Sequence, residues 1–560
     1  MISRSVIEEI KSLFIKKDYE LALKVAKEKT QIEERPAGLS NLLGLCKILK
    51  LNKDENDILS SMLDFEDAYL KEKNTIHGLD SLCNMISIST TYINSIKKLS
   101  EKILIAEQYF TEALKNFNDN EKLLINGVEL YKYFVDVPKI KEILEKLIHV
   151  NPKNISVIAR YAFVNNYTSH WKQENFFNHS KKYENYFFIN KVKPISEIDF
   201  KKNDKIRIGL VSRDFSKYHS VTFFVKKLLK YLDKNKFETY VFSFSDQVDE
   251  SSKEIKDSSE KWFNFNKLSN QEVIEKIQKE RIEVLIDIGG LTSSKRIEIF
   301  KSRVSPVQVS WLAYCNTIGF KNIDYLIADN NLIKSEENHY SEKIIKLKEI
   351  WNAHSGFDFK RDFSDTPAKK NNYITYGSFN NFLKISDETV YVWSEILKKS
   401  QNSKLILKSS NNSFPKRIID IFKKNGVLNS IEFYNRVDYP SLNEHLNLYR
   451  KIDIALDTFP FNGVTTSFEA LWCGIPVLTM SGYNFNSRCG SSILKNANLD
   501  QLISKNPEDY IVKALELSNN IDKLSILRRD IFDRILNTPL FDTKKFASNF
   551  GSSLLEIYKR

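Results

Sequence analysis

The segment from Asp457 to Glu469 combines residue types that suit the binding of a diphosphate. It follows an apolar run typical of a buried strand and precedes a run typical of a helix. Asn462-Gly463 predicts a turn, and Thr465 and Thr466 lie where the helix would begin. Free backbone N–H groups and the dipole at a helix start favour an anion, and hydroxyl groups add donors. The segment therefore predicts a phosphate site, with ordinary N-capping by Thr or Ser as the alternative.

A second polar segment, Tyr376 to Lys384, also follows a predicted strand. Asn380 and Asn381 would form a turn and contact a base edge, and Lys384 would neutralise a diphosphate as a point charge. The alternative is an ordinary polar loop with a surface lysine. In the first segment, Glu469 lies one helical turn in, where a carboxylate accepts from a ribose hydroxyl.

His219 lies in the segment Asp214–Ser220, directly after the first predicted strand of an earlier α/β region. A histidine at the carboxyl end of a strand faces the ligand crevice, where it serves as acid, base or hydrogen-bond donor. A structural loop histidine is the alternative. Glu280, just before another predicted strand, is a second candidate base, with a surface carboxylate at a helix end as its alternative.

No Asp-x-Asp pair occurs in the sequence. A transferase that binds its diphosphate through a divalent metal usually needs such acidic oxygen ligands. We therefore expect no metal and no cofactor, with Lys384 and a helix start stabilising a leaving diphosphate instead. The cysteines are odd in number and lack the spacing of a zinc site or a disulfide framework; they are Cys46, Cys83, Cys315, Cys473 and Cys489.

Composition excludes several classes of protein. The 560 residues are 42% hydrophobic and 28% charged, as in globular proteins. The net charge of +12 comes from dispersed lysines, and no basic run interleaves with aromatics as in a nucleic-acid groove. The first residues do not form a signal peptide, and no apolar stretch reaches the ~18 residues of a membrane span. We expect a cytoplasmic protein without nucleic-acid partners.

Residues 1–195 are predicted to be helical, because apolar residues recur there at three- and four-residue spacing. Two helix ends are alike: Asn118 and Asn151 lie 33 positions apart, and Asn120 and Asn154 lie 34 apart. This is the period of a tetratricopeptide-like helix-turn-helix repeat. The prediction is a degenerate repeat domain, with an irregular helical domain as the alternative.

Strands and helices alternate in two later regions. Short apolar runs typical of parallel strands begin at Ile206, and the alternation restarts at Tyr373 after a polar linker, Trp351–Lys370. The predicted fold class is α/β, with two Rossmann-like domains at residues 196–365 and 366–560. A ligand would bind at the carboxyl ends of the strands, in the cleft between these domains.

From Ile206 to the C-terminus the chain resembles the catalytic region of the O-GlcNAc transferase family, especially its bacterial and SPINDLY-like members. The resemblance rests on four segments in the same order: Ser305–Tyr314, Gly377–Ile385, His445–Met480 and Asn486–Leu494. It implies a GT-B fold, a UDP-sugar donor, inversion at the anomeric carbon and no metal. The helical repeats match the family's architecture and imply a groove for a polypeptide acceptor.

By position, the resemblance places Lys384 at the diphosphate, Asn381 and His445 in the nucleotide pocket, and Glu469 at the ribose. His219 resembles the active-site histidine after the first strand. The predicted catalytic residues are His219 and Lys384. The predicted UDP-sugar site comprises Asn381, Lys384, His445, Asn462, Gly463, Thr465, Thr466 and Glu469.

Departures from the family pattern gather in the half that would bind the sugar and the acceptor. This chain has one extra residue between Phe215 and His219, and Phe223 stands where bacterial members commonly have a histidine. Leu291 replaces an aromatic residue or histidine, Val464 stands where animal enzymes have a histidine, and Cys315-Asn316 replaces a Pro-Gly pair. The sequence therefore leaves the sugar and the acceptor open.

The predicted reaction is a direct displacement in which an acceptor group attacks the anomeric carbon from the face opposite UDP. We expect transfer of GlcNAc or another hexose to Ser or Thr of a protein. One alternative is UDP-glucose-dependent N-glucosylation of Asn. Another is a helical-repeat scaffold with an inactive transferase domain.

Overall fold

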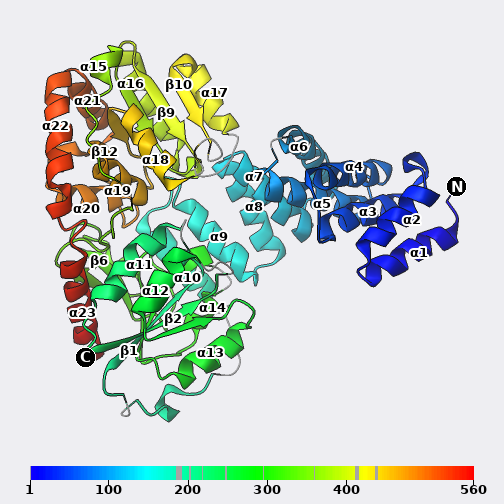
Figure 1. Ribbon diagram of the computed structural model, residues 1–560, viewed down its shortest axis with the longest axis horizontal. Coiled ribbons are helices and arrows are strands. Elements are labelled where there is room, and N and C mark those ends of the chain that lie inside the picture. Colours follow the sequence, from blue (N-terminus) through cyan, green and yellow to red (C-terminus); the bar gives the residue numbers. More distant parts are fainter. Residues whose placement is uncertain are drawn as a thin grey trace. The chain divides into compact units, whose positions relative to one another are not determined.

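The computed structural model describes residues 2–96, 98–184, 192–200, 203–216, 219–245, 249–293, 296–358, 360–409, 415–435, 439 and 441–559. The chain divides into two compact units, which Figure 1 shows as ribbons. One is Met1–Pro152 with Asn411–Lys416, and the other is Lys153–Ser410 with Arg417–Arg560. The residues predicted as one helical domain, 1–195, thus fall in both units.

The first unit is built of helices, in agreement with the apolar spacing of its sequence. They are α1 (Arg4–Ile15), α2 (Tyr19–Lys29), α3 (Ala37–Leu49), α4 (Glu55–Lys71), α5 (Ile76–Tyr92), α6 (Leu99–Asn116), α7 (Glu121–Tyr133) and α8 (Val137–Val150). Consecutive helices pack against one another along the unit. The side chain of Asn120 caps α7 and that of Asn154 caps α9 (Ile155–Asn165), so the asparagines 34 positions apart are equivalent helix N-caps.

The second unit contains two sheets whose strands are all parallel in the described residues. The first sheet has the order β3-β2-β1-β4-β5-β6-β7. Its strands are β1 (Ile206–Ser212), β2 (Phe237–Ser243), β3 (Lys261–Asn264), β4 (Val284–Asp287), β5 (Val307–Ser310), β6 (Tyr325–Asp329) and β7 (Lys343–Leu347). Helices α11 (Ser220–Tyr231), α12 (Glu250–Ser258), α13 (Asn270–Lys279) and α14 (Glu298–Lys301) connect them, after α10 (Gln173–Tyr183).

The second sheet has the order β10-β9-β8-β11-β12-β13. Its strands are β8 (Thr375–Ser378), β9 (Lys404–Lys408), β10 (Ile431–Tyr434), β11 (Ile454–Leu456), β12 (Val477–Met480) and β13 (Ile503–Ser504). Its helices are α15 (Ala368–Asn371), α16 (Asp387–Lys399), α17 (Lys416–Lys424), α18 (Leu442–Leu448), α19 (Thr465–Trp472), α20 (Cys489–Asn496), α21 (Pro507–Ser518) and α22 (Ile521–Arg534).

The strand orders locate the ligand crevice of each sheet. In the first sheet the order reverses between β1 and β4, and in the second between β8 and β11. Loops that leave the carboxyl ends of such strand pairs diverge and open a crevice. The structure therefore confirms the predicted fold class of two Rossmann-like domains preceded by helices.

The last helix, α23 (Thr543–Lys559), returns to the first sheet although it follows the second in sequence. It packs against α11, and the ring of Phe550 lies 4.8 Å from that of Trp311, next to β5. In Figure 1 the red C-terminal helix accordingly runs beside the green first sheet. One hydrophobic cluster includes residues of both sheets, so the two Rossmann-like domains share a core.

Candidate functional site

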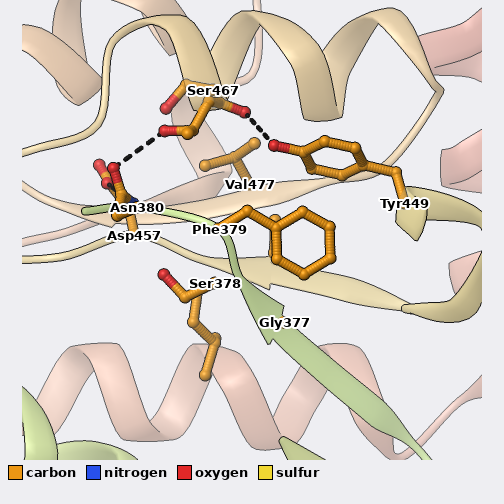
Figure 2. A pocket seen from close by; sticks show the side chains of 11 residues that line it. Gly377, Ser378, Phe379, Asn380, Tyr449, Asp457, Ser467 and Val477 are labelled. Carbon is orange, nitrogen blue, oxygen red and sulfur yellow. Dashed lines mark hydrogen bonds between the residues drawn. The ribbon is translucent and has the colours of Figure 1, made fainter. Parts of the chain in front are cut away.

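A small pocket occupies the crevice of the second sheet. Its lining comes from strands β8, β11 and β12, from the residues that follow β8, β11 and α18, and from the start of α19 (Figure 2): Gly377, Ser378, Phe379, Asn380, Tyr449, Ala455, Leu456, Asp457, Thr466, Ser467 and Val477. The two segments in which the sequence predicted a nucleotide site thus meet at the predicted edge of the sheet.

Helix α19 starts without a side-chain cap. Its N-cap residue is Val464, which has no cap hydrogen bond. The hydroxyl of Thr466 instead donates to the side chain of Asn380, and that of Ser467 to the carbonyl of Gly463. The alternative of plain N-capping by Thr or Ser is therefore wrong for this helix, and its start is suited to an anionic ligand.

Asp457 holds the loop that leads into α19. Its carboxylate accepts from the backbone N–H of Gly463 at 2.6 Å, from that of Thr458 at 2.9 Å and from the hydroxyl of Thr479 at 2.7 Å. Only 2% of Asp457 is exposed, and this burial raises its pKa to about 6, against the lowering effect of the hydrogen bonds and Lys384. Sequence reasoning gave Asp457 no role; a carboxylate directly after a buried strand was the available signal.

The two residues of the predicted turn shape this loop rather than project from it. Asn462 is fully buried, and its side chain donates to the carbonyl of Thr458 and accepts from the N–H of Gly490. A Cβ on Gly463 would lie 2.5 Å from the Thr466 hydroxyl oxygen and 2.8 Å from Asn380 Oδ1, so only glycine fits.

Lys384 reaches the same loop from the neighbouring strand. Its ammonium donates to the carbonyl of Asn462 at 2.9 Å and lies 4.2 Å from the centre of the Phe461 ring. Burial lowers the pKa of Lys384, while the nearby Asp457 raises it. Asn381, three residues earlier, uses its side-chain oxygen to accept from the N–H of Leu383.

Glu469 and His445 form a polar group one turn further along α19, next to the pocket residue Tyr449. The carboxylate of Glu469 is 3.0 Å from His445 Nε2 and accepts from the Tyr449 hydroxyl at 2.9 Å. The Phe379 ring lies 4.6 Å from that of Tyr449, and both are labelled in Figure 2. Phe379 and Tyr449 are thus aromatic lining residues that sequence reasoning did not select.

His219 lies at the carboxyl end of the first sheet, as predicted, where it is the N-cap residue of α11. Its Nδ1 accepts from the N–H of Val221 over a long 3.4 Å, and its Nε2 lies 3.6 Å from Asp214. Burial lowers the pKa of His219, while Asp214 raises it. Lys217 and Tyr218 of the same predicted segment lie outside the described residues.

Glu280 is wrong as a candidate base. It ends α13 before β4 begins, and its carboxylate pairs with Lys261 at the first position of β3, 2.7 Å away. It therefore lies at the amino edge of a parallel sheet, opposite the crevice, which confirms the alternative of a surface carboxylate.

The two crevices are connected through packed aromatic residues. The ring of Phe224 on α11 lies 5.4 Å edge-on from that of Phe468 on α19. Helix α11, which His219 caps, therefore packs against α19. His354 stacks between Phe223 and Phe468 and is fully buried, which lowers its pKa well below the usual range. The start of the predicted linker, from Trp351 to Ser355, thus lies in the shared core, where Phe223 packs on it.

In the described ranges, no group of three or more His, Cys, Asp or Glu side chains is arranged to hold a metal ion. Across those same ranges, no helix is long and apolar enough to cross a membrane.

Two Rossmann-like domains, each with a parallel sheet and a crevice at its switch point, are the arrangement of the GT-B fold. The chain shares this fold with a solved O-GlcNAc transferase mutant from Thermobaculum terrenum, at a TM-score of 0.77 and 22% identity, over 90% of this chain and 94% of that one. A family model described as glycosyl transferase family 41 matches residues 185–355 and 365–550. The chain belongs to this family, which confirms the predicted resemblance.

Curated relatives cover the same region. The chain is 30% identical over 365 residues to "Probable UDP-N-acetylglucosamine--peptide N-acetylglucosaminyltransferase SPINDLY" of Petunia hybrida, over 63% of this chain and 38% of that protein. It is 27% identical to the corresponding protein named SEC of Arabidopsis thaliana, over 63% of this chain and 37% of that protein. The chain thus spans less than half the length of these relatives.

Proposed function

We propose that this protein is a metal-independent, inverting glycosyltransferase that moves a sugar from a UDP-sugar to Ser or Thr of an acceptor protein. The observation that carries the proposal is the uncapped start of α19 beside the partly buried ammonium of Lys384. The relatives are named as probable peptide N-acetylglucosaminyltransferases, which supports GlcNAc as the sugar. No cofactor enters the proposed reaction.

The diphosphate of the donor would bind where these two features meet. The backbone N–H groups of Thr465 and Thr466 supply directed donors, and Lys384 supplies a full positive charge. Both act on the charge that develops as the nucleoside diphosphate leaves, so they would stabilise the transition state more than the bound donor. In this scheme Asn462 and Gly463 shape the loop, and Asp457 fixes it.

The nucleoside would bind next to this position, further along α19. Glu469 would accept from a ribose hydroxyl, with His445 and the hydroxyl of Tyr449 orienting its carboxylate. Asn381, two residues after Phe379, would contact the base edge. The rings of Phe379 and Tyr449 give the pocket an apolar wall.

In the transfer step the acceptor oxygen forms a bond to the anomeric carbon as the bond from that carbon to the UDP oxygen breaks. The electron pair leaves with UDP, and the acceptor proton moves to a base. His219 is the proposed base, because its lowered pKa keeps it neutral near pH 7. To accept the proton at Nδ1, it must release the long contact with the N–H of Val221.

The acceptor and its surroundings complete the proposal. The helical hairpins α1–α8 would present a polypeptide acceptor, as stacked helix pairs offer an extended binding surface. The five cysteines are free, which supports a reducing, cytoplasmic setting. No nucleic-acid partner is proposed.

The decisive experiment is UDP-sugar turnover by Lys384→Ala. We expect turnover to fall by about 10²–10³-fold, the usual effect of removing one group that stabilises a leaving anion. Lys404→Ala is the matched control, because Lys404 belongs to the same domain and pairs with Glu432 at the surface. Wild-type turnover in Lys384→Ala, with the fold intact, would refute the assignment.

Two further measurements separate the remaining alternatives. Intact-mass analysis of a modified acceptor, followed by β-elimination, distinguishes Ser or Thr linkage from N-glucosylation of Asn. Titration with UDP tests the scaffold alternative, since a scaffold with an inactive domain need not bind the nucleotide.

A further inference from the structure

The ammonium of Lys384 is held in place by an aromatic ring. The Phe461 ring centre lies 4.2 Å from it, close enough for a cation–π contact, and both side chains are largely withdrawn from solvent. The two residues come from different loops, since Lys384 follows β8 and Phe461 follows β11. A ring attracts the ammonium without neutralising it, so the charge stays available to an anionic ligand.

Phe461 is itself supported by residues outside both sheets. The ring of Tyr167 stacks on it at 5.5 Å and 27°, and the ring of Phe163 meets it edge-on at 6.5 Å. Phe163 lies on α9, and Tyr167 follows that helix directly. Phe461 is only 9% exposed and Tyr167 only 7%, so the stack has little room to rearrange.

The end of α9 is fixed to loops of both Rossmann-like domains. The side-chain oxygen of Asn166 accepts from the amide of Asn316, after β5, at 2.9 Å. It also accepts from the amide of Asn486, which precedes α20. The hydroxyl of Tyr483 donates to the carbonyl of Thr168 at 3.1 Å. The aromatic stack is therefore attached to a helix end that cannot turn freely.

We propose that the end of α9 is part of the donor site, with Tyr167 and Phe461 as positioning residues that orient Lys384 toward the diphosphate of the donor. This inference rests on the proposed function. A lysine side chain is long and flexible, and ordering it upon binding lowers affinity. The aromatic stack orders Lys384 before the ligand binds. The resulting gain in affinity should therefore depend on the diphosphate of the ligand and not on its nucleoside.

This difference gives the test, in which the affinities of UDP and uridine for the full chain are measured by calorimetry. Phe461→Leu removes the ring face and keeps an apolar side chain. We expect it to weaken the binding of UDP about 2- to 30-fold, as loss of one partly desolvated cation–π contact does, and to leave the binding of uridine unchanged. Unchanged UDP affinity would overturn the inference. So would an equal loss for both ligands, because the stack would then support the whole pocket.

A second pair of variants separates positioning from mere packing. Tyr167→Leu should show the same UDP-specific loss, and Tyr167→Phe, which keeps the stacked ring, should restore wild-type affinity. Phe110→Leu is the matched control, since Phe110 is a buried aromatic residue that packs on Tyr131 and belongs to none of the loops above. A UDP-specific loss of the same size in Phe110→Leu would count against the inference.

Double variants keep this inference distinct from the proposed function. In a Lys384→Ala background, Phe461→Leu should no longer change UDP affinity, because the group that it positions is absent. A full additional loss in that background would overturn the inference while the UDP site stands. If Lys384→Ala itself leaves UDP affinity unchanged, the proposed function fails first.

Discussion

Replacing Asp457 by asparagine should change how the stability of the nucleotide-binding domain depends on pH. Asn has the same shape, keeps an oxygen for the N–H groups of Gly463 and Thr458, and places an amide beside the Thr479 hydroxyl, which can accept from it. The variant should therefore keep the loop and lose only the ionisation.

The magnitude follows from the pKa of Asp457. Burial raises it from 3.8 to about 6. Because the folded pKa lies above the unfolded one, the stabilising contribution of the protonated group is complete below pH 3.8 and is lost as the pH rises through about 6. A shift of about two units corresponds to about 3 kcal/mol. For a domain of this size that is roughly 6–12 °C in Tm.

The assay is thermal unfolding of wild type and Asp457→Asn in matched buffers between pH 4 and pH 8. The Tm of the variant relative to wild type should rise across this range by the amount above. The difference in Tm between variant and wild type cancels the contribution of other buried carboxyls that titrate in both proteins. Asp287 and Asp329 are examples, since burial also raises their pKa values to about 6. A difference in Tm that stays constant with pH would refute the account of Asp457.

Three other predictions concern the donor and the reaction. Glu469→Gln should weaken the binding of UDP about 10- to 100-fold, because it removes a charged acceptor, and should leave the affinity for inorganic pyrophosphate unchanged. Both affinities can be measured by calorimetry, and equal losses for the two ligands would contradict a role of Glu469 at the ribose. His219→Ala should lower kcat while UDP affinity stays at the wild-type level. In the wild type, the acid limb of the kcat–pH profile should lie below pH 6.5, since the pKa of His219 is lowered and its neutral form is the base. Turnover should survive EDTA treatment, and a loss that Mg²⁺ or Mn²⁺ restores would contradict metal independence.

Much of the fold could be predicted from local patterns. The apolar runs at Ile206–Ser212 and Val477–Met480 are strands in the structure. Three strands of the structure have no such run in the sequence: Lys261–Asn264, Lys343–Leu347 and Ile503–Ser504. The first two carry exposed lysines at their starts and lie at or near a sheet edge, and the third has only two residues. Edge strands of this kind lack the continuous apolar run of a buried parallel strand.

The candidate site could be predicted where it is built from segments that follow strands. Residues at the carboxyl ends of neighbouring parallel strands must meet, so Lys384 and the start of α19 could be placed together from sequence. Contacts that depend on the packing of distant segments could not. Tyr167 lies almost 300 positions before Phe461, and no local pattern links them. The burial of Trp351 to Ser355 could not be predicted either, because this polar stretch indicated a linker between domains.

One such long-range contact gives a prediction that the sequence could not. Arg488, before α20 in the second domain, pairs with Glu336, which follows β6 in the first. The side chains are 9% and 10% exposed, and Arg488 also donates to the carbonyls of Leu332 and Gly482. Glu336→Ala would leave a buried guanidinium without its counter-charge, a change that destabilises by about 3–5 kcal/mol.

The adjacent residue provides the control for that experiment. Glu337 pairs with Lys346, but these side chains are 48% and 32% exposed, so Glu337→Ala should change stability by no more than about 1 kcal/mol. Because the Arg488 pair joins the two Rossmann-like domains, Glu336→Ala should also split their unfolding in calorimetry, with the nucleotide-binding domain alone stabilised by UDP. Equal, small effects of both variants would show that the domains are held together by the shared apolar core and not by this ion pair.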